Sequence, residues 1–263
     1  MHTNQETIVI KVGTSTLTHQ TGMLNIRKIE ELCKIVCDLQ NSGKRIVLVS
    51  SGAVSAGRTK LHIAAPSLTT EQKQAAAAIG QCELMDIYSR NMAMYSHITA
   101  QILLTKDAID NPERRNHAEN TFRILLENGI IPIVNENDSV SCDEIKFGGN
   151  DTLSAYVALL AHADLLINLS DVDGFFDSDP RKNKNARLIS EVTGIDSRIL
   201  SCAEGAGTDR GTGGMITKLK AADIVMNAGI DMIITNGASP AVLYDICAGK
   251  QVGTRFLKKE KAE

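Results

Sequence analysis

The sequence lacks the features that mark several protein classes. No uncharged run approaches the roughly 18 residues that a membrane-spanning helix needs. The polar stretch from Met1 to Glu6 leads directly into an apolar run, which is not the pattern of a signal peptide. The six cysteines form no CxxC pair, and the six histidines form neither HxxxH nor HExxH. We therefore expect a cytoplasmic protein with free, reduced thiols and no zinc site.

An excess of basic charge is also missing. The 263 residues carry 28 Lys and Arg against 31 Asp and Glu, which gives a net charge of −3. A general nucleic-acid binder would be strongly basic, so that class is excluded. Hydrophobic residues make up 43% and charged residues 22%, as in ordinary globular proteins. A chain of this length buries about three quarters of its unfolded surface, and we expect one large α/β domain or two lobes.

Short apolar runs alternate with longer amphipathic stretches along the chain. The apolar runs are rich in Val, Ile and Leu, which is typical of parallel strands covered by helices on both faces: Thr7–Val12, Arg45–Ser50, Ile98–Leu104, Ile130–Val134, Leu165–Leu169 and Asp231–Thr235. Three helical stretches carry apolar residues every three or four positions: Ile26, Ile29, Cys33 and Val36; Ala118, Phe122 and Leu125; Met215, Leu219, Ala222 and Met226. The alternation predicts a doubly wound α/β sandwich, in which Asp177–Lys184 is the one candidate linker.

Ligands of open parallel sheets bind beyond the carboxyl ends of the strands. Each of the first two predicted strands is followed there by a turn of small residues. Lys11 ends the first strand before Gly13; a lysine in an apolar strand either contacts an anion there or extends to water from an edge strand. Ser51 and Gly52 follow the second strand, where backbone N–H groups either bind an anion or form an ordinary capped turn. The GxxxxGK[ST] spacing of a Walker loop is absent here.

Polar clusters follow the later strands. Asn135–Asp138 comes after one strand, and Gly149-Asn150-Asp151 follows a short polar excursion. Carboxylates and amides at both places suit an amino-acid head group, although Asn and Asp are also common turn residues. Ser170-Asp171 follows the next strand, and Gly211–Lys218 opens the last amphipathic helix. A glycine-rich loop with a lysine in the first helical turn suggests a polyphosphate site, because that lysine opposes the helix dipole and needs an anionic partner.

These motifs together resemble the amino-acid kinase family. They occur in the family's order from Thr7 to about Phe256, as Lys11-Val12-Gly13-Thr14-Ser15, Ser50-Ser51-Gly52-Ala53, Asn135–Asp138, Gly149-Asn150-Asp151 and Gly213-Gly214-Met215-x-Thr217-Lys218. The resemblance implies an α/β fold, an αβα sandwich with a mostly parallel open central sheet. It implies one kinase domain over residues 1–263, with a glutamate-binding lobe over about 1–160, an ATP-binding lobe over about 161–257 and a charged tail over 258–263. The PUA domain that many members carry at the C-terminus is not expected here.

The resemblance also assigns roles to residues. Lys11, Asp151 and Lys218 would be catalytic, the lysines contacting the transferred phosphoryl group and Asp151 orienting them. Substrate glutamate would be held by Ser51, Gly52, Asp138 and Asn150, with Asp138 on its ammonium. The ATP site would comprise Lys11, Gly13, Ser170, Asp171, Thr212, Gly213, Gly214, Met215, Ile216, Thr217 and Lys218. Gly149 stands where many members carry Asp, and Ser170 where many carry Thr.

Within the family, the Lys-x-Gly-Thr-Ser start and the Asn-Glu-Asn-Asp turn point to members that phosphorylate glutamate. The implied reaction transfers the ATP γ-phosphoryl group to the glutamate γ-carboxylate, with Mg²⁺ carried by ATP and no metal site of the protein's own. The carboxylate is already ionised at neutral pH, since a free Glu titrates near 4.3, so no general base is needed. The resemblance further implies the first step of proline synthesis and inhibition by proline. It implies delivery of the product to a glutamate-semialdehyde dehydrogenase, a homo-oligomer, and no nucleic acid or membrane as partner.

Two alternatives stay open at this level. One is another kinase of the same fold, acting on carbamate or acetylglutamate. The other is a non-catalytic nucleotide-binding member, which would be expected to have lost a phosphate-facing lysine, whereas Lys11 and Lys218 are both present.

Overall fold

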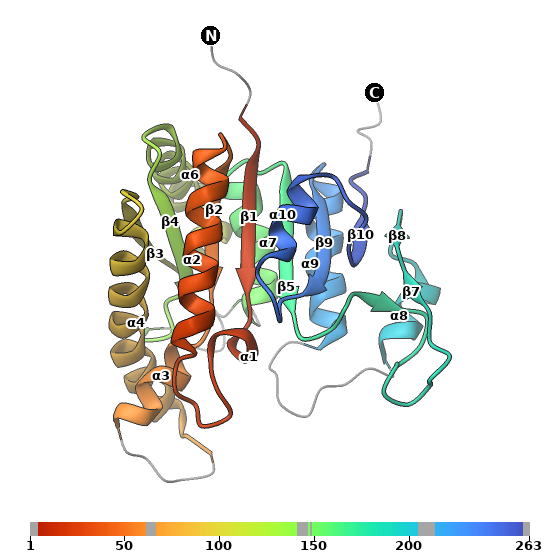
Figure 1. The fold of residues 1–263 in the computed structure, drawn as a ribbon, viewed down its shortest axis with the longest axis horizontal. Coiled ribbons are helices and arrows are strands. Elements are labelled where there is room, and N and C mark those ends of the chain that lie inside the picture. Colours follow the sequence, from red (N-terminus) through yellow and green to blue (C-terminus); the bar gives the residue numbers. More distant parts are fainter. Residues whose placement is uncertain (1–4, 62–66, 141–146, 148, 205–213, 260–263) are drawn as a thin grey trace.

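An eight-stranded sheet with helices on both faces forms the body of the protein (Figure 1). The computed structural model describes residues 5–61, 67–140, 147, 149–204 and 214–259. The strands are β1 (Thr7–Val12), β2 (Arg45–Ser50), β3 (Thr99–Leu104), β4 (Ile131–Glu136), β5 (Leu165–Ser170), β6 (Phe175–Phe176), β7 (Leu188–Ile189), β8 (Glu191–Val192), β9 (Asp231–Asn236) and β10 (Thr254–Phe256). The helices are α1 (Thr14–Leu17), α2 (Ile26–Asn41), α3 (Ala53–Lys60), α4 (Thr70–Ala93), α5 (Asp107–Asp110), α6 (Pro112–Glu127), α7 (Asn150–Leu160), α8 (Ser197–Glu204), α9 (Met215–Asn227) and α10 (Val242–Cys247).

The sheet is mostly parallel. Its strand order is β3-β4-β2-β1-β5-β9-β10-β8, and β6 and β7 form a separate antiparallel pair. All neighbouring strands from β3 to β9 run parallel, whereas β10 runs antiparallel to β9 and parallel to β8. The predicted αβα sandwich with a mostly parallel open sheet is confirmed.

All six predicted strands are present, four of them with shifted ends. The strands β3 and β4 begin at Thr99 and Ile131, one residue later than the apolar runs suggested. Asn135 and Glu136, which the sequence placed in a turn, are instead the buried last two residues of β4. The turn begins only at Asn137. Polar residues at the end of this buried strand therefore do not mean that the strand has stopped pairing with its neighbours. They lie at the end of the sheet where the candidate site is expected.

Alternating side chains divide the core into two layers. Ile8, Ile10 and Val12 of β1 face a cluster that includes α2, α4 and α10. Val9 belongs to the opposite cluster, which α6, α7 and α9 cover. Lys11 is two residues from Val9 and therefore lies on the face covered by α7 and α9.

A glycine in the left-handed conformation follows each of three helices. Gly43, Gly129 and Gly229 all have positive φ, at 96°, 68° and 81°, directly after α2, α6 and α9. Left-handed glycine closes a helix without the steric penalty of a Cβ. Each of these glycines thus ends its helix.

Residues of the predicted apolar stripes are buried in the core or pack half-buried against it, except at two positions. Ile26 is 55% exposed because it is the first residue of α2 and lies outside the packed turns. On α6 the buried position is Leu126, whereas Leu125 is only half-buried. Cys33 and Cys37 are buried, unpaired thiols of α2, as expected for small apolar fillers.

The predicted linker Asp177–Lys184 is part of the loop between β6 and β7. Asp179 is buried there and accepts hydrogen bonds from Arg181 of the same loop. Among the described helices, none combines the length and apolar character that a membrane span requires.

Candidate active site

The ends of β1 and β5 and the first turns of α7 and α9 meet at one edge of the sheet. Lys11 is the penultimate residue of β1 and lies in register with Asn168 of β5. The helices α7 and α9 pack against each other, and α7 also contacts β1 and β5. This arrangement brings together Lys11, Asp151 and Lys218, which lie far apart in the sequence.

Asp151 lies between the two lysine ammonium groups. Its Oδ1 is 2.7 Å from Nζ of Lys11, and its Oδ2 is 3.2 Å from Nζ of Lys218. All three residues are buried, with 7%, 3% and 6% of Lys11, Asp151 and Lys218 exposed. Buried ammonium groups require counter-charges. Two lysines and one carboxylate leave this cluster with a formal charge of +1, which favours an anionic ligand.

The electrostatics of the cluster are strongly coupled. Burial lowers the pKa of Lys11, the Asp151 carboxylate opposes that shift, and Lys218 adds to it by charge repulsion. Burial opposes ionisation of Asp151, but the charges of Lys11 and Lys218 and the hydrogen bonds to the carboxylate outweigh it. The pKa of Asp151 is therefore held well below its usual range. Asp151 is ionised throughout the neutral range and stabilises both ammonium groups.

Two neutral groups also contact the Asp151 carboxylate. Asn168 donates from Nδ2 to Oδ1 at 2.9 Å. Thr217 donates from Oγ1 to Oδ2 at 2.8 Å. Each carboxylate oxygen thus accepts one ammonium group and one neutral donor. Sequence analysis missed Asn168, although it interrupts an apolar strand just as Lys11 does, and that signal could have found it.

On the other side of the cluster, Asn150 connects the start of α7 with the ends of β2 and β4. Its Nδ2 lies 2.8 Å from the Ser50 carbonyl oxygen, 2.9 Å from Ser51 Oγ and 3.0 Å from Asn135 Oδ1. The predicted substrate residues Ser51 and Asn150 are therefore in direct contact. Because they come from the ends of β2 and α7, the contact fixes the turn after β2 against the first turn of α7.

A second set of buried residues supports these groups from α4. Gln81 accepts a hydrogen bond from Asn135 Nδ2 at 3.0 Å through its Oε1. The Tyr88 hydroxyl lies 2.8 Å from Ser50 Oγ, and burial raises the pKa of Tyr88 above its usual value. Neither Gln81 nor Tyr88 has a signal in the sequence, because α4 carries no motif and reaches the site through tertiary packing.

Two further predicted substrate residues, Gly52 and Asp138, lie outside the helices and strands, as does Gly149. Gly52 has φ 98° and precedes α3, a conformation that favours glycine. Gly149 has φ 122° before α7, so glycine also suits the backbone at the position where many family members carry Asp. Asp138 is half-buried in the turn after β4, at the same sheet edge. Its backbone position agrees with the predicted substrate side.

The predicted ATP residues that the structure describes come from the ends of β1 and β5 and the first turn of α9. A Cβ on Gly13 would lie 3.7 Å from Lys11 Nζ, an ordinary van der Waals distance, so Gly13 lies beside the ammonium group. Ser170 is buried at the end of β5 and donates to Asp171 Oδ1 at 3.1 Å. The N-cap of α9 is Gly214, and Met215, Ile216, Thr217 and Lys218 form its first turn. Thr212 and Gly213 lie outside the described residues.

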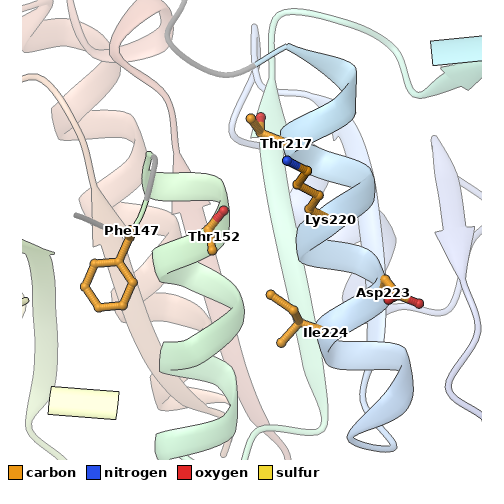
Figure 2. A pocket seen from close by; sticks show the side chains of 6 residues that line it. All are labelled: Phe147, Thr152, Thr217, Lys220, Asp223 and Ile224. Carbon is orange, nitrogen blue, oxygen red and sulfur yellow. The ribbon is translucent and has the colours of Figure 1, made fainter. Parts of the chain in front are cut away.

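A cavity of about 370 Å³ opens beside Thr217, between α7 and α9 (Figure 2). Thr152 lies on α7, and Thr217, Lys220 and Ile224 lie on α9. Thr217 therefore belongs both to this cavity and to the Asp151 cluster. Within the part of the chain that the structure describes, no group of three or more His, Cys, Asp or Glu side chains is arranged to hold a metal ion.

Residues 6–236 match the amino acid kinase family. The chain belongs to this family. Its curated relatives include the glutamate 5-kinase of Clostridium perfringens, 52% identical over 257 residues that cover 96% of each chain. The glutamate 5-kinase of Listeria innocua is 48% identical over 262 residues, which cover 98% of this chain and 95% of the relative.

Solved structures agree on the fold. Carbamate kinase from Giardia lamblia bound to AMP-PNP superposes with a TM-score of 0.68 at 18% identity, covering 97% of this chain and 99% of that one. UMP kinase from Bacillus anthracis gives a TM-score of 0.61 at 17% identity, with 97% of each chain covered. At such identities the likeness concerns the fold alone.

Proposed function

We propose that this protein transfers the γ-phosphoryl group of ATP to the γ-carboxylate of L-glutamate, giving γ-glutamyl phosphate and ADP. One observation carries the proposal for phosphoryl transfer: Lys11 and Lys218, both buried, share the single carboxylate of Asp151 at the carboxyl end of a parallel sheet. The choice of glutamate as acceptor rests on the names of the curated relatives, which are about half identical to this chain.

The chemistry requires little beyond positioning and positive charge. An oxygen of the glutamate γ-carboxylate forms a new bond to Pγ, while the bond from Pγ to the bridging oxygen of ADP breaks and its electron pair leaves with ADP. The main barrier is the approach of two anions, which preorganised positive groups reduce. Lys11 and Lys218 would contact the transferred group, and Asp151 would keep both ammonium groups aimed at it.

The glutamate would lie on the side of Ser51, Gly52, Asp138 and Asn150. Ser51 and Asn150 are already held together by a hydrogen bond of 2.9 Å, so they would present a fixed surface to the substrate. Asp138 would accept the substrate ammonium, because an ammonium in a partly dry pocket needs a carboxylate partner.

ATP would lie over the first turn of α9 and the ends of β1 and β5. Gly13, Ser170, Asp171 and the segment from Thr212 to Lys218 would line its site. The N-terminus of α9, with Gly214 as N-cap and no side-chain cap, offers N–H groups that suit phosphate oxygens. Mg²⁺ would arrive with the ATP phosphates and reduce their negative charge.

The family resemblance extends the proposal beyond the reaction. The chain would carry out the first step of proline synthesis in the cytoplasm, and proline would inhibit it by occupying the glutamate site. The labile product would pass to a glutamate-semialdehyde dehydrogenase, and the enzyme would act as a homo-oligomer. Residues 1–160 would form the glutamate lobe and 161–257 the ATP lobe of one domain.

An acceptor panel tests the proposed function. ADP release would be measured with ATP, Mg²⁺ and one of L-glutamate, acetylglutamate, aspartate, carbamate or UMP. We expect glutamate to give the highest kcat/KM. Equal or better activity with another acceptor would favour a different kinase of the same fold, and no ADP release with any acceptor would favour a non-catalytic member.

A further inference from the structure

Asn168 and Lys11 are the two polar residues in a row of four that crosses the sheet beneath α7 and α9. In register, Val49 of β2, Lys11 of β1, Asn168 of β5 and Ile234 of β9 lie side by side. The row two residues earlier is apolar throughout, with Val47, Val9, Leu166 and Met232. Asn168 is completely buried. A buried amide at this position therefore needs a specific partner, and its neighbours in the row offer none but Lys11.

That partner is the Asp151 carboxylate from α7. Asn168 Nδ2 donates to Asp151 Oδ1 at 2.9 Å, on the same oxygen that Lys11 contacts. Thr217 occupies the matching place on Oδ2, but its hydroxyl also lies 2.8 Å from the Gly214 carbonyl oxygen, so one hydrogen serves two acceptors. Asn168 is thus the neutral donor committed to Asp151.

The other end of the amide carries a stability penalty. Asn168 Oδ1 is buried and has no hydrogen-bond partner among the described residues. An unsatisfied buried oxygen destabilises the folded state. An aliphatic side chain of similar size would fit the row without that penalty. Stability alone therefore does not account for asparagine at this position.

A positioning role accounts for it. During phosphoryl transfer, Lys11 and Lys218 must direct hydrogen bonds to phosphate oxygens and so weaken their contacts with Asp151. The carboxylate would then lose donors while remaining buried, and its orientation would no longer be fixed. A neutral donor has no attraction to phosphate comparable to that of an ammonium group, so the Asn168 hydrogen bond persists when the lysines move.

We infer that Asn168 is a positioning residue, whose amide holds the Asp151 carboxylate in place while Lys11 and Lys218 engage the phosphoryl group. This inference rests on the proposed function. It assigns to β5 a part in catalysis that is separate from the nucleotide-binding residues at its end.

Replacement of Asn168 by leucine tests the inference, with Ile234→Val as a packing control in the same row. In Asn168→Leu we expect kcat to fall about 10- to 100-fold, the range typical of groups that orient an active-site residue, while the KM for glutamate changes less than about threefold. The melting temperature should change little, because removal of the unsatisfied oxygen offsets the loss of the hydrogen bond to Asp151. Ile234→Val should lower the melting temperature slightly and leave kcat unchanged.

A double-mutant comparison with Asp151 distinguishes a positioning role of Asn168 from a role in packing alone. In an Asp151→Asn background, Asn168→Leu should change kcat by less than about threefold, because the carboxylate that Asn168 positions is no longer present. If Asn168→Leu does not fold, Asn168→Ala removes the donor without adding bulk or charge, and it should show the same loss of kcat.

Two outcomes would overturn the inference: wild-type kcat in Asn168→Leu or Asn168→Ala, or a loss of kcat that is fully additive with Asp151→Asn. Wild-type activity, measured in parallel, distinguishes a failure of this inference from a failure of the proposed function. If the wild type releases no ADP with glutamate, the proposed function fails, and the variants are compared with whichever acceptor of the panel supports ADP release.

Discussion

Replacing Asp151 by asparagine would remove the charge that both buried lysines contact while keeping the shape of the side chain. The amide cannot neutralise Lys11 and Lys218, which would then repel each other in a buried environment. Removing one partner of a buried ion pair typically costs about 3–5 kcal/mol. Because single domains are stable by about 5–15 kcal/mol, the variant should still fold, but with a much smaller margin.

Urea unfolding at pH 7 would measure the loss, with Asp223→Asn as the control. Asp223 also lies close to a lysine, at 3.9 Å from Lys259, but both side chains are about half exposed at 49% and 47%. A pair of that kind contributes at most about 1 kcal/mol. Equal losses of unfolding free energy in the two variants would refute the reasoning that the Asp151 charge stabilises the buried lysines.

The pH dependence of the same measurement gives a second check. The pKa of Asp151 is lowered in the folded state, so its contribution to stability is fully present above the unfolded carboxyl pKa near 3.9. It is lost as the pH falls below that value, because the unfolded chain binds the proton first. The difference between wild type and Asp151→Asn should therefore be largest above about pH 5 and shrink toward pH 3. A difference that grows in acid would contradict the assignment.

Four other predictions follow from the site and its support. Lys218→Ala should lower kcat about 10²–10³-fold with a small change in the KM for glutamate, and steady-state kinetics with near-normal kcat would remove Lys218 from the chemistry. EDTA should abolish ADP release and Mg²⁺ should restore it; full turnover in metal-free buffer would exclude the proposed mechanism. Asp138→Ala should raise the KM for glutamate at least about tenfold, since losing one member of a buried charge pair costs about 2–5 kcal/mol. The same variant should weaken inhibition by proline and leave the KM for ATP unchanged, and an unchanged glutamate KM would exclude Asp138 as a ligand. Gly80→Val should lower the free energy of unfolding by at least about 1–3 kcal/mol, because a Cβ there would lie 1.9 Å from the Ala53 carbonyl oxygen; wild-type stability in urea would show that α3 and α4 can separate freely.

The sequence alone determined the order of strands and helices and the edge where chemistry is expected. Apolar runs of five to seven residues are buried on both faces, which leaves the parallel sheet as the natural arrangement, and all six predicted strands are present. Lys11 was identified for a local reason, because a charged residue in an apolar strand needs a partner. The same logic applied to Asn168 would have found it as well.

Only the tertiary structure decided which groups meet. Asp151 lies 140 residues from Lys11 (151 − 11) and 67 from Lys218 (218 − 151), and no local pattern indicates that one carboxylate contacts both. That contact depends on how α7 and α9 pack together on one face of the sheet. This packing is determined by the burial of many apolar side chains from different parts of the chain. Gln81 and Tyr88 show the same limit, because their helix carries no motif and its approach to the site depends on two glycines, Gly57 and Gly80, at the crossing of α3 and α4. Sequence periodicity reports which face of an element is buried, but the partner it is buried against is a property of the whole packed chain.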